Sequence, residues 1–289
     1  MKKIICWFSG GVTSAVACKI AIDLYGKENC ISLFIDTKNE DEDTYRFMKD
    51  CEKWFGISID TLSAIPEKYK SIQEVWIKHL GLNFANGAIC SSELKRAVRL
   101  KWQRENDYGF QVFGFDIDEP KRAKAMTLNY PTANAIYPLL LHGLNKEMCI
   151  EILKDAGIEI PRAYKWGFRN NNCLGTGCVQ GGIGYWQHMK KVKPENFDAM
   201  AEMEHYLTDL KGQPVTMLKD QSKAAKASNN GKSQLVFLKP HRDYPNIKDI
   251  SIMKGRPPKP LFECNGFGCA VNDLECTNQT QLEINYQEV

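Results

Sequence analysis

A serine- and glycine-rich turn near the N-terminus has the residue types of a phosphate-binding loop. Ser9, Gly10 and Gly11 follow an apolar run of strand length, and a helix-like pattern begins around Thr13 and Ser14. Glycines let the backbone turn tightly and approach a ligand closely. N–H groups at the start of a helix attract an anion, aided by the helix dipole. The turn therefore predicts an anion cradle, to which the hydroxyls of Ser9 and Ser14 add donors.

The spacing of this turn separates it from two common nucleotide-binding motifs. It fits neither Gly-x4-Gly-Lys-Ser/Thr nor Gly-x-Gly-x-x-Gly. An ordinary strand–helix connection is the alternative, because Gly-Gly is a common turn dipeptide. The residues at other strand ends must decide between the two interpretations.

Polar and basic side chains follow the later apolar runs. Asp36 and Thr37 come directly after a strand-like run, at the end of the strand where a ligand would bind. Lys95 lies on a helical pattern, and Arg122 follows another strand-like run. An ammonium or a planar guanidinium suits phosphate contact, although a solvated basic face is the competing interpretation.

The elements that must position these residues alternate between two periodicities. Strand patterns occupy residues 4–8, 31–35, 57–62, 110–115 and 135–139, and helical patterns occupy 12–25, 42–55, 71–80 and 92–107. Such alternation predicts an α/β fold, with a parallel twisted sheet and helices on both faces. Ligands of such sheets bind at the carboxyl ends of the strands, so Ser9, Asp36 and Gly114 should gather at one edge.

The second half of the chain has a different pattern. Beyond about residue 145 the strand signal fades, and helices are expected at 146–157 and 194–210. We therefore predict a nucleotide-binding domain over 1–145 and a helical, Cys-rich region over 146–289. Its polar stretch near 219–234 is expected to be mobile.

Eleven cysteines fall into two groups. Those in apolar segments are expected to be small buried hydrophobes; they are Cys6, Cys18, Cys30, Cys51 and Cys149. The others lie in loop-like sequence, where a metal or redox role is expected in a reducing compartment; they are Cys90, Cys173, Cys178, Cys264, Cys269 and Cys276.

A short repetition arranges four of the loop cysteines. Residues 173–178 and 264–269 both read Cys-x-Gly-x-Gly-Cys. Four thiolates suit a structural Zn²⁺ site or a 4Fe–4S cluster. Free thiols are the third possibility, and which four cysteines would bind a metal is open.

Composition narrows the class of protein. The chain has 289 residues, 43% hydrophobic and 25% charged, and a net charge of +3. These fractions are typical of a soluble globular protein, and the charge is too small to argue for nucleic-acid binding. No segment has the length of a membrane span, so we expect no membrane partner and a cytoplasmic location.

Five motifs in the same order resemble one known family. The loop at 9–14 is similar to the Ser-Gly-Gly-x-Asp-Ser loop of the PP-loop ATP pyrophosphatases. Residues 36–47 resemble the Asp-Thr-Gly-x-Glu segment of their phosphoadenosine phosphosulfate (PAPS) reductase-like branch, and 90–96 resemble its Cys-x-x-x-Leu-Lys segment. Residues 114–122 are similar to Gly-x-x-x-x-Glu-Ser-x-x-Arg, and 137–139, 164–168, 186 and 194–197 continue the match.

This resemblance implies an adenine nucleotide alpha hydrolase-like fold and an enzyme that binds ATP with Mg²⁺. It implies cleavage of the α–β phosphate bond to adenylate a substrate, coupled to sulfur transfer. The implied catalytic residues are Cys90, Lys95 and Arg122. The implied nucleotide-binding residues are Ser9, Gly10, Gly11, Thr13, Ser14, Asp36, Thr37, Gly114 and Glu119.

The resemblance also indicates a second grouping of thiols. Cys90, Cys173 and Cys178 would hold a 4Fe–4S cluster with one iron open for a transferable sulfur, with Zn²⁺ as the alternative.

Two departures from the family pattern keep other functions open. Thr13 stands where the family loop has an acidic residue, and Cys90 stands alone where the iron–sulfur reductases have adjacent cysteines. The Glu-Cys-Gly tail of the reductases is also missing. A sulfonucleotide (PAPS/APS) reductase and a catalytically silent nucleotide- or partner-binding module are therefore alternatives. The acceptor is open among tRNA, DNA, protein and small molecules, and so is a homo-oligomeric state.

Overall fold

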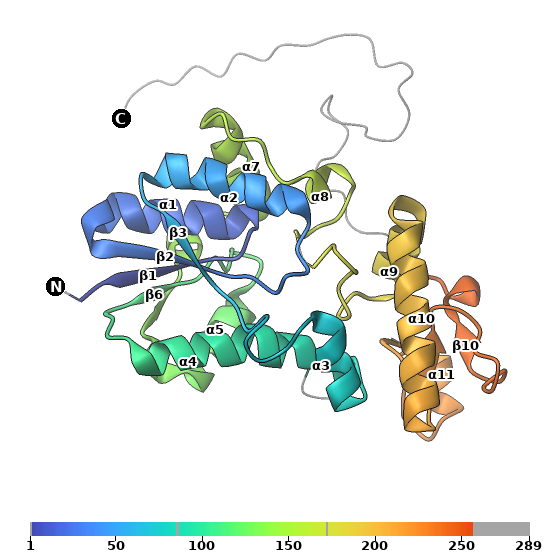
Figure 1. Cartoon of the computed structure of the whole chain (residues 1–289). Coiled ribbons are helices and arrows are strands. Elements are labelled where there is room, and N and C mark those ends of the chain that lie inside the picture. Colours follow the sequence, from blue (N-terminus) through green and yellow to red (C-terminus); the bar gives the residue numbers. More distant parts are fainter. Residues whose placement is uncertain (1, 85–86, 172, 257–289) are drawn as a thin grey trace, which may run out of the picture.

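A five-stranded parallel sheet forms the centre of the N-terminal half. The computed structural model describes residues 2–84, 87–171 and 173–256 (Figure 1). The sheet has the order β3-β2-β1-β6-β7, and every adjacent pair is parallel. Its strands are β1 (Ile4–Phe8), β2 (Cys30–Ile35), β3 (Ile59–Leu62), β6 (Gln111–Val112) and β7 (Ala135–Ile136).

The central strand β1 is buried on both faces, as expected for a parallel sheet covered by helices. Ile4, Cys6 and Phe8 belong to one core cluster, whereas Ile5 and Trp7 belong to another. This strict alternation follows from the two-residue period of a strand.

Helices cover both faces of this sheet (Figure 1). Helix α1 packs against α2, α6 and α7 on one face, and α4 and α5 lie on the other. Their bounds are α1 (Val12–Tyr25), α2 (Glu42–Phe55), α4 (Ala97–Glu105), α5 (Pro120–Asn129), α6 (Pro138–Leu141) and α7 (Lys146–Asp155). The core of the first face therefore extends past residue 145.

In the second half, two helices pack into a core that they share with residues 64–94 of the first half. Trp186 on α9 (Ile183–Val192) and Phe197 on α10 (Pro194–Lys211) are fully buried in it. A three-stranded sheet completes this part, with the order β10-β9-β8. Its strands are β8 (Leu218–Asp220), β9 (Gln234–Phe237) and β10 (Lys248–Asp249).

Short elements connect these layers. They are η1 (Lys27–Asn29), α3 (Ile72–His79), β4 (Asn83–Phe84), β5 (Gly87–Ala88), the π-helical η2 (Ser91–Arg96), η3 (Pro131–Ala133), α8 (Arg162–Lys165), α11 (Lys223–Ala227) and η4 (Ile250–Ile252).

The α/β class and the parallel sheet are confirmed, and three expectations are corrected. The expected strands at 110–115 and 135–139 are two residues each, and a helical turn begins at Pro138. The second half is not purely helical, because it contains the β8–β10 sheet. The polar stretch 219–234 holds α11 and the ends of two strands, while its expected mobility stays a prediction.

Candidate functional site

The loop at 9–14 lies where the sheet changes direction. From β1 the chain order runs outward to β2 and β3 on one side and to β6 and β7 on the other. Ligands of open α/β sheets bind in the crevice at such a switch point. A cavity of about 310 Å³ occupies this position, between the loop after β1 and the loop after β6. Of the residues expected to bind nucleotide or catalyse, it is lined by Ser9, Gly11, Thr13, Ser14, Gly114, Glu119 and Arg122.

The loop is held in its turn by its own hydroxyls. Gly10 has a φ of +78°, a conformation that favours glycine, and its added Cβ would lie 2.6 Å from Thr44. The backbone N–H of Ser9 donates to Ser14 Oγ at 3.0 Å, and Ser14 Oγ donates to the Gly11 carbonyl at 2.8 Å. The two serines therefore hydrogen-bond to each other and to the backbone of the loop.

The N-terminus of α1 is suited to an anion. Its N-cap, Gly11, provides no side-chain hydrogen bond, and the first turn has no acidic residue. The N–H of Val12 donates to Tyr164 Oη at 3.2 Å. The N–H groups of a helix start point toward the cavity side of such a loop, where the dipole favours negative charge. The helix start therefore has no competing acidic side chain, and the anion cradle expected from the sequence stays a prediction.

Gly114 allows β6 to approach this helix start closely. A Cβ at Gly114 would lie 2.7 Å from both the backbone nitrogen and the Cα of Ser14. Such a distance requires the backbone to move. Any residue other than glycine would therefore push the β6 loop away from the cradle.

Four residues from the second half line this cavity, and sequence reasoning gave none of them a role; they are Lys146, Tyr164, Asn170 and Asn171. Tyr164 and Asn171 fix the loop, since Asn171 Nδ2 donates to the Gly10 carbonyl at 2.8 Å. Lys146 is only 8% exposed, and burial lowers the pKa of its ammonium group. Its Nζ donates to the Arg169 carbonyl at 3.0 Å. Tyr164 lies in the segment 164–168, which resembles the PAPS reductase-like family, and this could have indicated it. For Lys146, the sequence indicated only that a helix begins there.

Arg122 lines this cavity and a second one beside it. Its guanidinium lies 4.8 Å from the Phe115 ring and forms an ion pair with Glu119. Two thirds of its side chain is exposed, so the guanidinium can still contact a ligand. A phosphate in either cavity would lie within reach of the same cation.

The second cavity, of about 180 Å³, brings together three of the expected cysteines. Cys90, Cys173 and Cys178 all line it, although 83 residues separate the first from the second. Lys95 and Thr37 line it as well. We refer to it as the thiol cavity.

The thiol cavity joins buried sulfur to positive charge. Burial raises the pKa of Cys173 to about 11, and the ammonium group of Lys95 opposes that rise. Burial likewise raises the pKa values of Cys90 and Cys178. The pKa of Lys95 is raised by Cys173 first and also by Glu40, whose carboxylate lies 3.6 Å from Nζ. Lys95 therefore stays charged beside the thiols.

Trp76 provides a further donor at this cavity. Its buried indole N–H lies beside the Cys90 sulfur, and donation toward that sulfur lowers the pKa of the thiol. The indole N–H is therefore a donor for sulfur in this cavity.

The distances between the three sulfur atoms bear on the zinc site that was expected as one alternative. Across the described chain, the three sulfur atoms do not all lie within 4.8 Å of one another. Tetrahedral Zn²⁺ with bonds of about 2.3 Å needs its sulfur ligands roughly 3.8 Å apart. As placed, the three thiols are not all close enough together to bind one zinc ion. Cys264, Cys269 and Cys276 lie outside the described residues.

Asp36 was expected among the nucleotide-binding residues, but it does not line the 310 Å³ cavity beside the loop at 9–14. We refer to this cavity, which is the candidate nucleotide site, as the nucleotide cavity. Both carboxylate oxygens of Asp36 are engaged, since Oδ1 accepts from the Lys38 N–H at 2.7 Å and Oδ2 pairs with Lys38 Nζ at 2.8 Å. Tyr45 Oη also donates to it, and the residue is 1% exposed. A metal ion at Asp36 would therefore have to share these oxygens with Lys38 and Tyr45. Thr37 and Gly10 also lie elsewhere: Thr37 lines the thiol cavity, and Gly10 packs against Thr44.

The five isolated cysteines behave as predicted from their apolar segments. All are buried, with at most 7% of the residue exposed, and burial contributes to raising the pKa values of Cys51 and Cys149. They are part of the core and are not candidates for chemistry.

Fold and site together define a Rossmann-like α/β protein with an anion cradle beside a thiol cavity. No family model and no curated protein matches the chain. Among solved structures, it is similar to phosphoadenylyl-sulfate (PAPS) reductase from Candida auris in a phosphate complex, with a TM-score of 0.43 and 14% identity over 58% of this chain and 80% of that one. It is also similar to the U34-tRNA thiolase NcsA from Methanococcus maripaludis with its [4Fe-4S] cluster, with a TM-score of 0.42 and 13% identity over 79% of this chain and 80% of that one.

None of the helices in the described ranges combines the length and apolarity of a membrane span.

Proposed function

We propose that this protein is a PP-loop enzyme of the PAPS reductase-like kind, which binds ATP in the cradle at 9–14 and adenylates an acceptor. In this proposal, the sulfur chemistry takes place in the thiol cavity. The observation that carries it is the position of Arg122, which lines both cavities. A phosphate at the cradle and a sulfur group among the cysteines would then be neighbours.

The adenylation step assigns a task to each part of the cradle. An acceptor oxygen attacks the α-phosphorus, forming an O–P bond while the bond from the α-phosphorus to the bridging oxygen breaks. Pyrophosphate leaves with the electron pair of that bond. Negative charge on the leaving group grows next to the α1 N-terminus and to Arg122, which stabilise it. Lys146, whose pKa is lowered by burial, lines the same cavity.

The sulfur step would follow at the thiol cavity. A sulfur nucleophile attacks the carbon that carries the activated oxygen, and AMP leaves with that oxygen. Cys90, Cys173 and Cys178 would hold a 4Fe–4S cluster, which supplies an iron on which a transferable sulfur can be bound. Lys95 and Trp76 would hydrogen-bond to sulfur there and offset its negative charge.

Anaerobic purification provides the first test. We expect a broad visible absorbance with iron and acid-labile sulfide in equal amounts, and formation of AMP and pyrophosphate from ATP when an acceptor is present. Cys90→Ser, Cys173→Ser and Cys178→Ser should each lose the absorbance, whereas Cys276→Ser, the matched control, should keep it. Stoichiometric zinc without colour would contradict the cluster and leave plain adenylation.

A sulfonucleotide reductase is the second candidate, because three thiols face one cavity beside a phosphate cradle. It requires PAPS or its unphosphorylated relative as the substrate and a thiol reductant as the electron donor. Sulfite release that depends on the reductant, without any pyrophosphate from ATP, would favour it over adenylation.

Thr13 supports a third candidate, a silent nucleotide-binding module. Thr13 lines the nucleotide cavity, where the family loop has an acidic residue. If the missing carboxylate limits turnover, Thr13→Asp should raise ATP cleavage, while Thr13→Asn, which has similar size and no charge, should not. Equal rates in both variants would remove Thr13 as the cause.

A further inference from the structure

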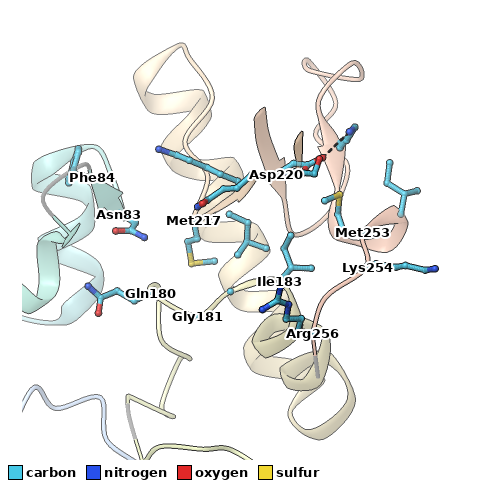
Figure 2. A pocket seen from close by; sticks show the side chains of 17 residues that line it. Asn83, Phe84, Gln180, Gly181, Ile183, Met217, Asp220, Met253, Lys254 and Arg256 are labelled. Atoms are coloured by element: carbon cyan, nitrogen blue, oxygen red, sulfur yellow. Dashed lines mark hydrogen bonds and ion pairs between the residues drawn. The ribbon is translucent and has the colours of Figure 1, made fainter. Parts of the chain in front are cut away.

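A third cavity adjoins the thiol cavity, and the proposed function leaves it without a role. It has a volume of about 830 Å³ and lies between the start of α9, the strand β8 and the segment before residue 257 (Figure 2). Figure 2 shows Asn83 and Gln180 on one side of it and Ile183 and Arg256 on the other. We propose that this cavity binds a phosphate-bearing acceptor, an inference that rests on the proposed function and names the acceptor's chemical class.

The charge of the lining favours an anion. Four basic residues line the cavity, and Asp220 is the acidic one. Asp220 is neutralised by Lys248, whose Nζ lies 3.1 Å from its carboxylate. Within residues 2–84, 87–171 and 173–256, the remaining three cations form no ion pair; they are Lys219, Lys254 and Arg256. Phosphate is the ligand group that such cations and a guanidinium recognise most directly.

Dedicated hydrogen bonds fix two walls of the cavity. Gln187 on α9 donates to the Met253 carbonyl at 2.6 Å and accepts from the Gly255 N–H at 3.1 Å, so it holds the segment that ends at Arg256. Glu204 on α10 is fully buried and accepts from the N–H of Met217, which lines the cavity, at 2.8 Å. Preformed walls are typical of a binding site, because a ligand does not then have to order them.

Gln180 lies between this cavity and the site of the proposed chemistry. It lines both the 830 Å³ cavity and the thiol cavity. In the same way, Arg122 lines both the thiol cavity and the nucleotide cavity. The three cavities therefore form one series along the molecule. An acceptor with its phosphate at Arg256 would therefore occupy a cavity that adjoins the thiol cavity at Gln180.

Size and overall charge favour a small phosphate ester over a nucleic-acid strand. Small-molecule sites have volumes of roughly 300–1,000 Å³, a range that includes this cavity. The chain as a whole has a net charge of only +3. Binding of a strand depends on a large basic surface, which so small an excess does not supply.

Pyridoxal 5′-phosphate provides a site-resolved test on the full-length protein. Its aldehyde forms an imine with a lysine amine, which borohydride reduces to a stable adduct for mass spectrometry. Pyridoxal, which lacks the phosphate, is the matched control reagent. We expect the phosphorylated reagent to label Lys219 and Lys254 about fivefold faster than pyridoxal does, because the cationic cavity concentrates anions. The exposed Lys226 and Lys232, outside the cavity, should show no such preference.

Variants and competitors assign the preference to the cavity. Arg256→Glu should abolish it at Lys219, whereas Lys232→Glu, with the same change of charge, should keep it. Ribose 5-phosphate should protect Lys219 and Lys254, and a ten-residue oligothymidylate should not. Protection by the oligothymidylate alone would overturn the small-ester assignment in favour of a strand. Equal labelling ratios at all four lysines would overturn the site itself.

ATP binding by the same sample separates this inference from the proposed function. If ATP binds and the lysine preference is absent, only the acceptor site is wrong. If the preference is present and ATP does not bind, the cavity stands as a phosphate site and the adenylation proposal fails.

Discussion

Ser14 has a structural role in the cradle that its place in the sequence did not reveal. Its hydroxyl accepts from the Ser9 N–H and donates to the Gly11 carbonyl, and it lies 3.0 Å from Ser9 Oγ. The same oxygen therefore closes the turn and lies at the cavity. The Ser14 hydroxyl could donate to a bound phosphate only by giving up its hydrogen bond to the Gly11 carbonyl. The net gain in binding free energy from this hydroxyl is therefore smaller than that of a newly formed hydrogen bond.

We expect Ser9→Ala/Ser14→Ala to weaken ATP binding by about tenfold or more, since hydrogen bonds to charged groups contribute about 1.5–3 kcal/mol each. Titration calorimetry measures the affinity, and the melting temperature shows whether the loop change also destabilises the fold. Ser58→Ala, before β3, is the control. Normal ATP affinity in the double variant would disprove the cradle assignment.

The site residues found from sequence are those whose type and local order carry the signal. Gly114 and Arg122 follow strand ends and lie in the cavity as expected. Asp36 also follows a strand end, but its carboxylate accepts from the backbone N–H of Lys38 and forms an ion pair with the Lys38 ammonium group. No rule of residue spacing indicates this contact. Lys146 reaches the cavity because α7 packs against α1. That contact joins segments far apart in the sequence, so no local pattern predicts it.

At the scale of elements, periodicity located the long helices well and the irregular ones poorly. The helices at 12–25 and 42–55 begin and end as predicted. Capping residues explain the second: Asp41 accepts from the Asp43 N–H at its start, and Gly56 takes a left-handed conformation at its end. The helix expected at 92–107 instead begins as the π-helical η2, because the wider hydrogen-bond pattern has no signature in side-chain spacing.

The contact between the β6 loop and α1 leads to a prediction at this scale. Gly114→Ala places a Cβ 2.7 Å from the Ser14 backbone, so it should displace the loop after β6 and lower the free energy of unfolding by about 1–3 kcal/mol. ATP affinity should fall with it. Gly182→Ala is the control, because its Cβ would meet nothing within 4 Å. Urea unfolding and titration calorimetry measure both effects, and equal stability in the two variants would contradict the close approach.

Across the whole molecule, sequence reasoning missed the sheet in the second half as well as the helices α5 and α9. The strands of this sheet have two to four residues, too few for an alternating pattern to stand out from the polar residues around them. A buried carboxyl group holds it in place: Glu204 accepts from the N–H groups of Met217 and Leu238, next to β8 and β9. Such a long-range contact is invisible in a local window.

Glu204 makes stability depend on pH. Burial raises its pKa from 4.5 to about 8, against the opposing effect of the two N–H donors. The folded chain therefore retains a proton that the unfolded chain releases, so this contribution is complete below about pH 4.5 and declines as the pH rises to about 8. Each tenfold difference in acid strength is about 1.4 kcal/mol, so the difference between 4.5 and about 8 corresponds to a loss of about 5 kcal/mol.

Glu204→Gln removes this proton without removing the side chain. The variant should be less stable at pH 5, because an amide replaces one acceptor oxygen, and the difference from the wild type should shrink between pH 5 and 9. Urea midpoints at several pH values measure this difference. Parallel curves for the two proteins would contradict the raised pKa.

Tyr164 and Asn171 contact the N-terminal loop from more than 150 residues away. During synthesis on the ribosome, Ser9, Gly10 and Gly11 leave the exit tunnel long before the two side chains that support them have been added. A nascent chain that stops at residue 145 would have its sheet strands but no support for this loop. Competence to hold a nucleotide should therefore arise late in translation, only after the helical segment around residue 164 has emerged.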